Sequence, residues 1–273
     1  MNILTPDIKK FIDRSIIENI RRDRYDPVLR NIPRALDRLH DNIPDNRRIS
    51  YGIVHTLDVI TEYLYESLKD NLLFSAASTI FEKDDEFKNR AVSLGLFSWH
   101  GLKDFEGVLP YFKRAAADDF WITREITAHY FRRIIREHPT GVKPFLIGCA
   151  KSLDPNVRRF VGETLRPVTI NRWFHKDPGY SLSILGHLFR EKAPYPRTSV
   201  GNNLSDLARK NPELVYGIIE ELVKAGDKNS CWIAYRACRN LVKEEPARVM
   251  DLLGVEEYKY KGRNYKRDDY KGN

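Results

Sequence analysis

A short motif that recurs in the second half of the chain constrains the fold most strongly. Val-Gly-x-x-Leu occurs as VGETL from Val161 and again as VGNNL from Val200, 39 residues later. Leu204 of the second copy is matched by Leu241 after a further 37 residues. The copies lie in segments with a helical apolar period, and a second such segment follows each of them. Helix pairs that recur every 35–40 residues indicate an α-solenoid, because one pair cannot bury its apolar side alone.

The sequence therefore predicts an all-α fold, an α-solenoid of stacked antiparallel helix pairs. We find no convincing alternation of apolar and polar residues, which is typical of strands, and no Asn-Gly hairpin turn. We expect a helical cap over residues 1–50 and the repeat domain over residues 51–255. The cap is interrupted by three prolines, Pro27, Pro33 and Pro44. Residues 256–273 are a basic tail rich in Tyr and Lys, for which we expect no regular structure; the alternative is a flexible arm that binds phosphates and stacks on bases.

The composition permits a nucleic-acid partner and gives no sign of a membrane protein. Lys plus Arg exceed Asp plus Glu by 46 to 38, which gives a net charge of +8. That excess permits binding to nucleic acid without establishing it. No apolar run approaches the roughly 20 residues that a membrane helix needs, and the first residues lack the apolar core of a signal peptide. With three cysteines and no CxxC motif, we expect a cytoplasmic protein.

Arginines recur on the first helix of each predicted pair. Arginine outnumbers lysine there, which suits bidentate contacts with phosphate groups. Ordinary surface charge explains any single one of them, but helices that repeat in register should align them into a stripe. We therefore predict a phosphate-binding face that includes Arg124, Arg132, Arg158, Arg159, Arg166, Arg197, Arg236 and Arg239.

Carboxylates also lie within this predicted stripe. Glu163 follows Arg159 by four residues and precedes Arg166 by three, which is the spacing of helix ion pairs worth a few tenths of a kcal/mol each. Trp121 lies four residues before Glu125 and shares its helix face, although a tryptophan there is more often part of a core. The acids within the stripe are Glu125, Glu163 and Asp206.

Several common catalytic and cofactor motifs are missing from the sequence. The histidines show no HExxH motif or other paired metal spacing. No GxGxxG, P-loop or GxSxG motif is present. We therefore expect neither a metal nor a cofactor.

The second half of the chain resembles a known family. DPNVRRFVGETLRP (154–167), YPRTSVGNNLSDLARKNPELV (195–215) and the terminal run ending in LLG are similar to the DNA alkylation repair glycosylases of the AlkC and AlkD type. The similarity covers about residues 115–255 and is closer to the AlkC branch. It implies a HEAT-like solenoid that grips duplex DNA in a basic groove. It also implies removal of cationic N-alkylated purines such as 3-methyladenine and 7-methylguanine.

The resemblance further implies roles for individual residues. Glu125 corresponds to the glutamate of the T-x-E-x-A-x-x-x-F run that lines the AlkC-branch active site, and with Trp121 it matches the Trp–Asp spacing of the AlkD branch. Glu163 corresponds to the glutamate before the RP pair, and Asp206 to the Asp of the LND run. The implied catalytic residues are Glu125, Glu163 and Asp206. We expect Trp121 and Trp173 to bind the substrate, because an aromatic ring can stack on a cationic nucleoside through a cation–π contact.

Two aromatic positions of the family pattern are not matched. Asn171 stands where the AlkC branch has a tryptophan, with Trp173 two residues later, and Asn202 stands at an AlkD-branch tryptophan. The family also contains catalytically silent DNA binders. Two alternatives therefore stay open: a non-enzymatic HEAT-like protein that binds damaged or branched DNA, and a protein–protein scaffold.

The implied chemistry suits carboxylates. A purine alkylated at N3 or N7 is cationic and already a good leaving group, and positive charge develops at C1′ of the sugar in the transition state. Such a reaction needs fixed carboxylates beside that charge rather than a strong acid. We predict a monomeric, metal-free alkylpurine DNA glycosylase at the nucleoid, in which Glu125 and Glu163 share one hollow and double-stranded DNA is the partner.

Overall fold

The structure, a computed structural model, describes residues 2–48 and 52–270. These residues form fifteen α-helices, short 3-10 segments and one two-stranded sheet, which confirms the predicted all-α class. The chain divides into two compact units, residues 1–139 and 140–273. The expected boundary between cap and repeats falls in residues 49–51, outside the described residues. No helix in the described ranges combines the length and apolar character needed to cross a membrane.

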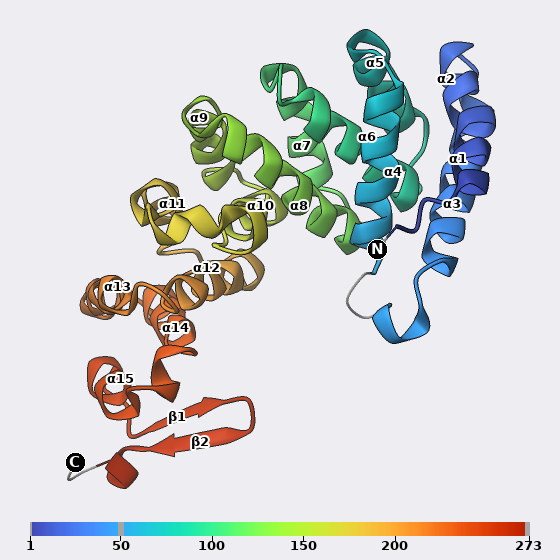
Figure 1. Cartoon of the computed structure of the whole chain (residues 1–273). Coiled ribbons are helices and arrows are strands. Elements are labelled where there is room, and N and C mark those ends of the chain that lie inside the picture. Colours follow the sequence, from blue (N-terminus) through green and yellow to red (C-terminus); the bar gives the residue numbers. More distant parts are fainter. Residues whose placement is uncertain (1, 49–51, 271–273) are drawn as a thin grey trace. The chain divides into compact units, whose positions relative to one another are not determined.

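In the first unit, α4, α6 and α8 pack side by side, with α5 against α6 and α7 against α8 (Figure 1). A π-helical turn, Asp13–Ile17, joins α1 to α2. The helices are α1 Pro6–Ile12, α2 Glu18–Arg21, α3 Tyr25–Asp41, α4 Ile53–Ser67, α5 Asp70–Lys83, α6 Phe87–His100, α7 Leu109–Ala116 and α8 Trp121–Glu137.

The N-terminal prolines interrupt the helices less than expected. α3 runs through Pro33, and Pro27 lies in its first turn, where its missing N–H leaves no helical hydrogen bond unmade. Burial of an apolar face that includes Ile32 and Leu36 offsets the cost of the internal proline. Only Pro44 lies beyond the end of the helix.

In the second unit, α10, α12 and α14 pack side by side, and α13 lies against both α12 and α14 (Figure 1). Most of these helices begin with proline, whose fixed φ suits the first helical position. The elements are α9 Pro139–Ala150, α10 Pro155–Thr164, α11 Pro178–Leu185, α12 Pro194–Leu207, α13 Pro212–Lys224, α14 Lys228–Ala237, α15 Pro246–Leu253, β1 Glu257–Tyr260 and β2 Arg263–Lys266.

The repeated glycine of the Val-Gly motif lets neighbouring helices approach closely. A Cβ added at Gly162 on α10 would lie 2.9 Å from the Cβ of Ser199 on α12. A Cβ added at Gly201 on α12 would lie 2.8 Å from the Cβ of Arg236 on α14. Since side chains do not approach each other so closely, each copy of the motif fixes the packing of its helix on the next one.

This packing predicts opposite effects for two glycine-to-alanine substitutions. Gly201→Ala should lower the free energy of unfolding by about 1–3 kcal/mol, because its methyl group would press on the stem of Arg236. Gly217→Ala on α13 faces open space and should raise it by about 0.5–1 kcal/mol through helix propensity. Urea unfolding of both variants measures the two changes. Equal changes in the free energy of unfolding would show that the packing of α12 on α14 does not require a glycine at position 201.

The C-terminal segment is more ordered than expected. β1 and β2 form an antiparallel hairpin with Tyr258 opposite Tyr265, and a 3-10 turn follows over Arg267–Tyr270. Tyr258 is fully buried, and its hydroxyl donates to the carbonyl oxygen of Tyr235 on α14 at 2.6 Å. This hairpin corrects the expectation of a tail without regular structure over 256–273, of which residues 271–273 lie outside the described residues. The tyrosine side chains of the hairpin supply its buried surface, which was not expected from the sequence.

Candidate functional site

Glu163 lies buried between α10 and α12, with 5% of its surface exposed. Ser199 on α12 donates to Glu163 Oε1 at 2.6 Å, and Arg166 donates to Oε2 at 3.3 Å. A guanidinium nitrogen of Arg159 lies 3.7 Å from Oε1. The helix ion pairs indicated by the spacing are therefore formed, and the next helix adds a hydroxyl that orients the carboxylate.

Arg166 joins Glu163 to Asp206. Its Nε and one terminal nitrogen donate to Asp206 Oδ2 at 2.8 and 2.6 Å, while Arg209 approaches Oδ1 at 3.5 Å. Burial alone would lower the pKa of Arg166, but attraction to Glu163 and Asp206 outweighs it, so its pKa is raised. The structure thus brings two of the predicted catalytic acids around one guanidinium group. Glu163, Arg166 and Asp206 are called the acid cluster below.

A hollow of about 150 Å³ lies beside the acid cluster and carries an excess of positive charge. Arg236 Nε donates to the side-chain oxygen of Asn202 at 3.0 Å, and Arg239 donates to the same oxygen and to the Tyr260 hydroxyl. Among the described residues, these two guanidinium groups thus bond to neutral side chains, which suits an incoming anion. The charged residues that line the hollow are Arg166, Arg209, Arg236, Arg239 and Asp206.

Two arginines of the predicted stripe hold loops of their own unit. Arg124 and Arg158 are each the fourth residue of their helix, α8 and α10. Arg124 donates to two carbonyl oxygens of the loop before α8 at 2.6 and 2.9 Å, and Arg158 does the same before α10 at 2.8 and 2.9 Å. Arg197, at the same position of α12, donates to Asn229 at 2.8 Å. The repetition of arginine at this position therefore has a structural cause.

Arg158 also forms a buried ion pair with Glu191, at 2.6 and 3.0 Å. Burial would raise the pKa of Glu191, but hydrogen bonds from Arg158 and from the Ala193 backbone N–H lower it below the ordinary glutamate value. A lowered pKa in the folded state means that the charged form stabilises the fold at and above the ordinary value of 4.5. That contribution is lost as the pH falls through the folded-state pKa.

Glu191→Gln should therefore lower the free energy of unfolding by about 2 kcal/mol at neutral pH, because it removes a charge-assisted pair. The difference from the wild type should shrink as the pH falls below 4.5. Urea unfolding at neutral and acidic pH measures it. A difference that stays constant, or grows, on acidification would contradict this assignment.

Glu125 and Trp121 lie on α8 in the first unit. Glu125 is half-buried, and Trp121 at the start of the helix is 57% exposed, so it is not the core residue that tryptophan usually is. Arg132, also on α8, is half-buried. Because Glu125 and Glu163 belong to different units, the expectation that they share one hollow stays a prediction.

A polar and aromatic cluster on α4, α6 and α8 was not predicted from the sequence. His129 Nε2 lies 3.3 Å from Asp58 Oδ1. The rings of Tyr65 and Trp99 stack at 4.6 Å, and the Arg133 guanidinium lies 3.9 Å from the centre of the Trp99 ring. The sequence does contain one indication of this cluster. Glu125, His129 and Arg133 are spaced four residues apart, which places them on one face of α8.

Trp173 lies in an aromatic group outside α10, α12 and α14. It belongs to a 3-10 segment, Thr169–His175, and its ring packs on Phe174 at 4.2 Å and on Tyr180 at 5.4 Å. Asn171 is fully buried and donates to the carbonyl oxygen of Thr164 at 2.7 Å, at the end of α10. The contacts of Trp173 give it a packing role, and its predicted role in substrate binding is untested.

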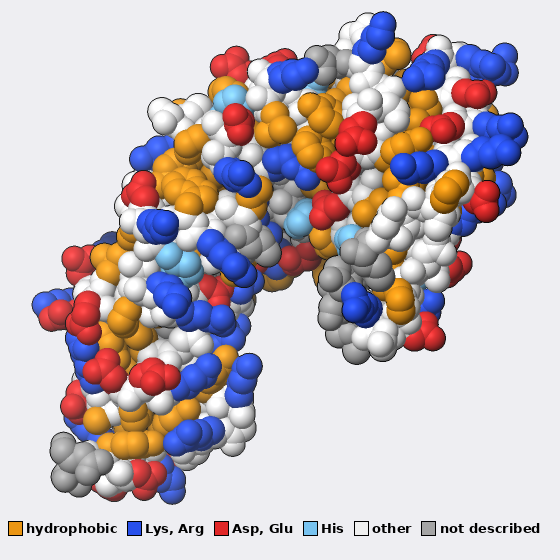
Figure 2. Space-filling model, viewed as in Figure 1, with side chains coloured by type: hydrophobic (Ala, Val, Ile, Leu, Met, Phe, Trp, Pro, Cys, Tyr) orange, Lys and Arg blue, Asp and Glu red, His pale blue; other side chains and the backbone are white. Residues whose placement is uncertain are grey.

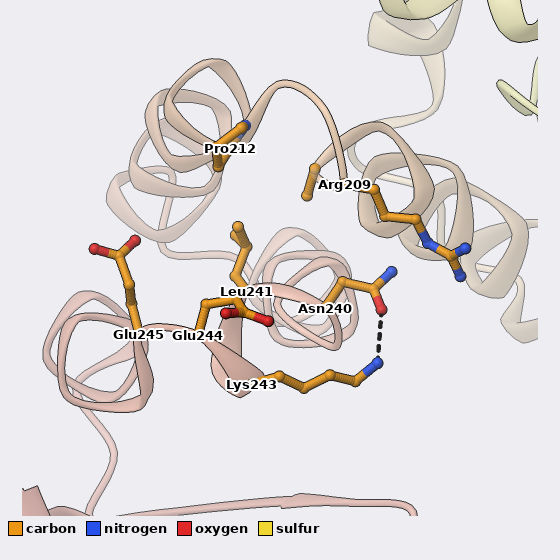
Figure 3. Close-up of a pocket in the computed structure, with 8 residues that line it drawn as sticks. Arg209, Pro212, Asn240, Leu241, Lys243, Glu244 and Glu245 are labelled. Carbon is orange, nitrogen blue, oxygen red and sulfur yellow. Dashed lines mark hydrogen bonds between the residues drawn. The ribbon is translucent and has the colours of Figure 1, made fainter.

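A further hollow of about 560 Å³ lies near the ends of α12 and α14, shown in Figure 3. The Arg209 guanidinium points away from the other labelled side chains, and Lys243 donates to Asn240 at 3.0 Å. Glu244 and Glu245 also line this hollow. Its charges balance, so nothing there favours an anion. Within residues 2–48 and 52–270, no group of His, Cys, Asp and Glu side chains is arranged to hold a metal ion.

Comparison with known sequences gives a partial relationship to a curated protein. No family model matches the chain. A stretch of 117 residues, 41% of the chain, is 28% identical to the uncharacterized protein YhaZ of Bacillus subtilis strain 168. This stretch corresponds to 32% of the YhaZ sequence, so the chain aligns with about a third of that protein.

Solved structures match most of the chain at low sequence identity. The smu.31 protein from Streptococcus mutans matches 76% of the chain and 97% of its own length, with a TM-score of 0.58 and 22% identity. AlkD2 from the same species matches 76% of the chain and 98% of its own length, with a TM-score of 0.57 and 20% identity. Alkylpurine DNA glycosylase AlkC from Pseudomonas fluorescens, bound to DNA containing an abasic site analogue, matches 93% of the chain and 70% of its own, with a TM-score of 0.58 and 20% identity. The chain therefore has the AlkC and AlkD type of fold, and the resemblance stated from its sequence is confirmed at the level of the fold.

Proposed function

We propose that the chain is a DNA glycosylase that removes cationic N-alkylated purines, such as 3-methyladenine and 7-methylguanine, from duplex DNA. The acid cluster carries this proposal, because its two buried carboxylates share Arg166. Arg166 and Asp206 also line a hollow with Arg236 and Arg239, which bond to neutral side chains among the described residues. The fold supports it, since one protein that shares this fold is an alkylpurine DNA glycosylase bound to DNA.

The proposed reaction breaks the bond between N9 of the purine and C1′ of the sugar. The electron pair of that bond leaves with the base, which becomes neutral, and positive charge develops at C1′. Water then adds to C1′ and loses a proton to the solvent. We assign Glu163 to the electrostatic stabilisation of this charge, because Ser199 and Arg166 already orient its carboxylate. Asp206 is assigned a supporting role through Arg166.

The arginines divide into two groups under this proposal. The first group is assigned to DNA phosphates. Its arginines bond mainly to neutral side chains or lie at the acid cluster. Arg124 and Arg158 are assigned mainly to holding the loops that precede their helices. Arg132 stays a proposed phosphate contact. The proposed phosphate contacts of the second unit are Arg159, Arg166, Arg197, Arg236 and Arg239.

Two residues of the first unit are also proposed to act on the nucleoside. Glu125 is proposed as a further catalytic carboxylate, and Trp121 as an aromatic that contacts the cationic nucleoside. The exposure of Trp121 supports this role, because an indole ring in solvent is available for a cation–π contact.

A second candidate function is DNA binding without catalysis. It is favoured by the contacts of Glu163, whose two oxygens already accept hydrogen bonds from Ser199 and Arg166. A carboxylate paired in this way has a structural role even without a substrate. Under this alternative the protein binds alkylated DNA and releases no base.

The deciding experiment incubates the protein with methylated duplex DNA and separates the released bases by chromatography. The glycosylase predicts release of 3-methyladenine or 7-methylguanine above that from DNA incubated alone. Binding measured by fluorescence anisotropy, with no release, would establish the second candidate. If the protein neither binds the methylated DNA nor releases a base from it, both functions are rejected.

A further inference from the structure

The C-terminal hairpin and α14 enclose a hollow of about 360 Å³ that the proposed reaction does not use. We call it the hairpin pocket. It lies next to the arginine-lined hollow beside the acid cluster, since Arg236, Arg239 and Tyr260 line both. Its lining combines aromatic rings with cations: Trp232, Tyr235 and Tyr260 with Arg236, Arg239 and Lys261.

The walls of the hairpin pocket are held in place by several contacts, and Tyr258 among them is fully buried. The rings of Tyr235 and Tyr258 stack at 4.3 Å, with 24° between their planes. The backbone N–H of Lys259 donates to the Tyr235 hydroxyl at 3.0 Å. Arg267 donates to Glu256 at 2.9 Å and also pairs with Asp251 on α15. Because the hairpin is fixed to α14 and α15 at several points, the pocket is formed before a ligand arrives.

The hairpin pocket has an excess of positive charge. The Arg239 guanidinium lies 4.9 Å from the centre of the Tyr260 ring, and the amino groups of Lys243 and Lys261 lie at 5.5 and 5.7 Å. Burial alone would raise the pKa of Tyr260, but the hydrogen bond from Arg239 and these cations lower it. The pKa of Arg236 is lowered by burial and by repulsion from Arg239. Lys and Arg side chains also gather over α14 and the hairpin in Figure 2.

The aromatic rings and cations of the hairpin pocket together suit one nucleotide. Trp232 and Tyr260 are half-buried, so part of each ring is accessible from the pocket. A base within duplex DNA is stacked on its neighbours and cannot use such a ring, whereas an unpaired base can. Proteins that bind single strands combine a positive groove for the backbone with aromatic side chains for the bases.

We propose that the hairpin pocket binds an unpaired nucleotide of a DNA strand, with its base on the Tyr260 ring and its phosphate on Arg236 and Arg239. This inference rests on the proposed function for the identity of the polymer. It adds a preference for DNA that carries a single-stranded end or gap next to the duplex. Such a preference is separate from base release.

The test compares two labelled duplexes, one blunt and one with a short oligothymidine overhang, by fluorescence anisotropy with the full chain at fixed salt. The wild type should bind the overhang duplex about tenfold more tightly, which is the effect of one stacked base. Tyr260→Leu should abolish this difference, so that the variant binds the two duplexes with equal affinity. Equal affinity of the wild type for both duplexes would overturn the proposal, as would a full preference in Tyr260→Leu.

Matched variants keep the test decisive. Tyr270→Leu removes a half-buried tyrosine of the same segment outside the pocket lining and should retain the preference. Thermal unfolding checks that Tyr260→Leu is folded. If Tyr260→Leu is not folded, Lys261→Gln and Arg263→Gln are compared, because Arg263 is a hairpin cation outside the pocket lining. Lys261→Gln should reduce the preference for the overhang more than Arg263→Gln does. Equal reductions would refute the site.

Two further arms identify the ligand and separate this inference from the proposed function. Thymidine monophosphate should displace the overhang duplex only at far higher concentration; if it binds as tightly, the ligand is a free nucleotide and the proposal fails. Base release from an internal lesion is measured on the same variants. A protein that prefers overhangs but releases no base rejects the proposed glycosylase alone, and the reverse result rejects the hairpin pocket alone.

Discussion

Glu163→Gln lowers the single-turnover rate of 7-methylguanine release by at least about a hundredfold, in line with the loss of one preorganised electrostatic group. The substitution keeps the size of the side chain and an oxygen that accepts from Ser199. It removes the negative charge that the proposal assigns to the stabilisation of C1′. Glu125→Gln is expected to give a loss of similar size. The rates are measured with enzyme in excess over methylated duplex DNA and corrected for spontaneous release.

Glu191→Gln is the matched control for this loss. Glu191 is also a buried glutamate paired with an arginine, but it lies outside the acid cluster. Its substitution should lower stability without changing the release rate of the folded protein by more than about twofold, because it removes no charge from the proposed site. If Glu163→Gln releases 7-methylguanine at the wild-type rate, the role assigned to Glu163 is wrong. If both variants lose activity only in proportion to their unfolded fraction, the acid cluster is structural.

Arg166→Met lowers the free energy of unfolding by about 3 kcal/mol, because it leaves two buried carboxylates without their shared cation. The control is Arg209→Met. Arg209 also pairs with Asp206, but its side chain is 64% exposed, so its loss should cost less than about 1 kcal/mol. Denaturant unfolding at neutral pH measures both changes.

A double variant tests the cause of this destabilisation. Adding Asp206→Asn to Arg166→Met removes one of the two carboxylates that lost Arg166, so part of the lost stability should return. If the double variant is less stable than Arg166→Met by the full cost of Asp206→Asn alone, the two residues do not interact. Equal destabilisation by Arg166→Met and Arg209→Met would also contradict the account of the acid cluster.

The helix stack could be predicted from the sequence because its determinants are local. The Val-Gly repeat indicated the helices that pack side by side, and the glycines at 162 and 201 fix their approach. The spacing of Glu163 also indicated its pairs with Arg159 and Arg166. The contact of Arg166 with Asp206 depends on how α10 and α12 lie against each other, which no spacing within one helix gives.

Other features needed contacts between distant parts of the chain. The hairpin left a signal, since tyrosine and lysine alternate from Tyr258 to Lys261 and Gly262 follows at the turn with positive φ. That alternation lacks aliphatic residues, so its burial against Tyr235 was not evident. The arginines at the fourth helix position suggested a phosphate stripe, but loop geometry gives Arg124 and Arg158 carbonyl partners within their own units.

The central claim is that carboxylates act on a nucleoside that is already cationic, with no acid needed to protonate the base. The most direct test compares release of 7-methylguanine with release of hypoxanthine, an uncharged purine, from otherwise identical duplexes. We predict release of 7-methylguanine well above its spontaneous rate and no enzymatic release of hypoxanthine. Release of hypoxanthine at a comparable rate would contradict the claim.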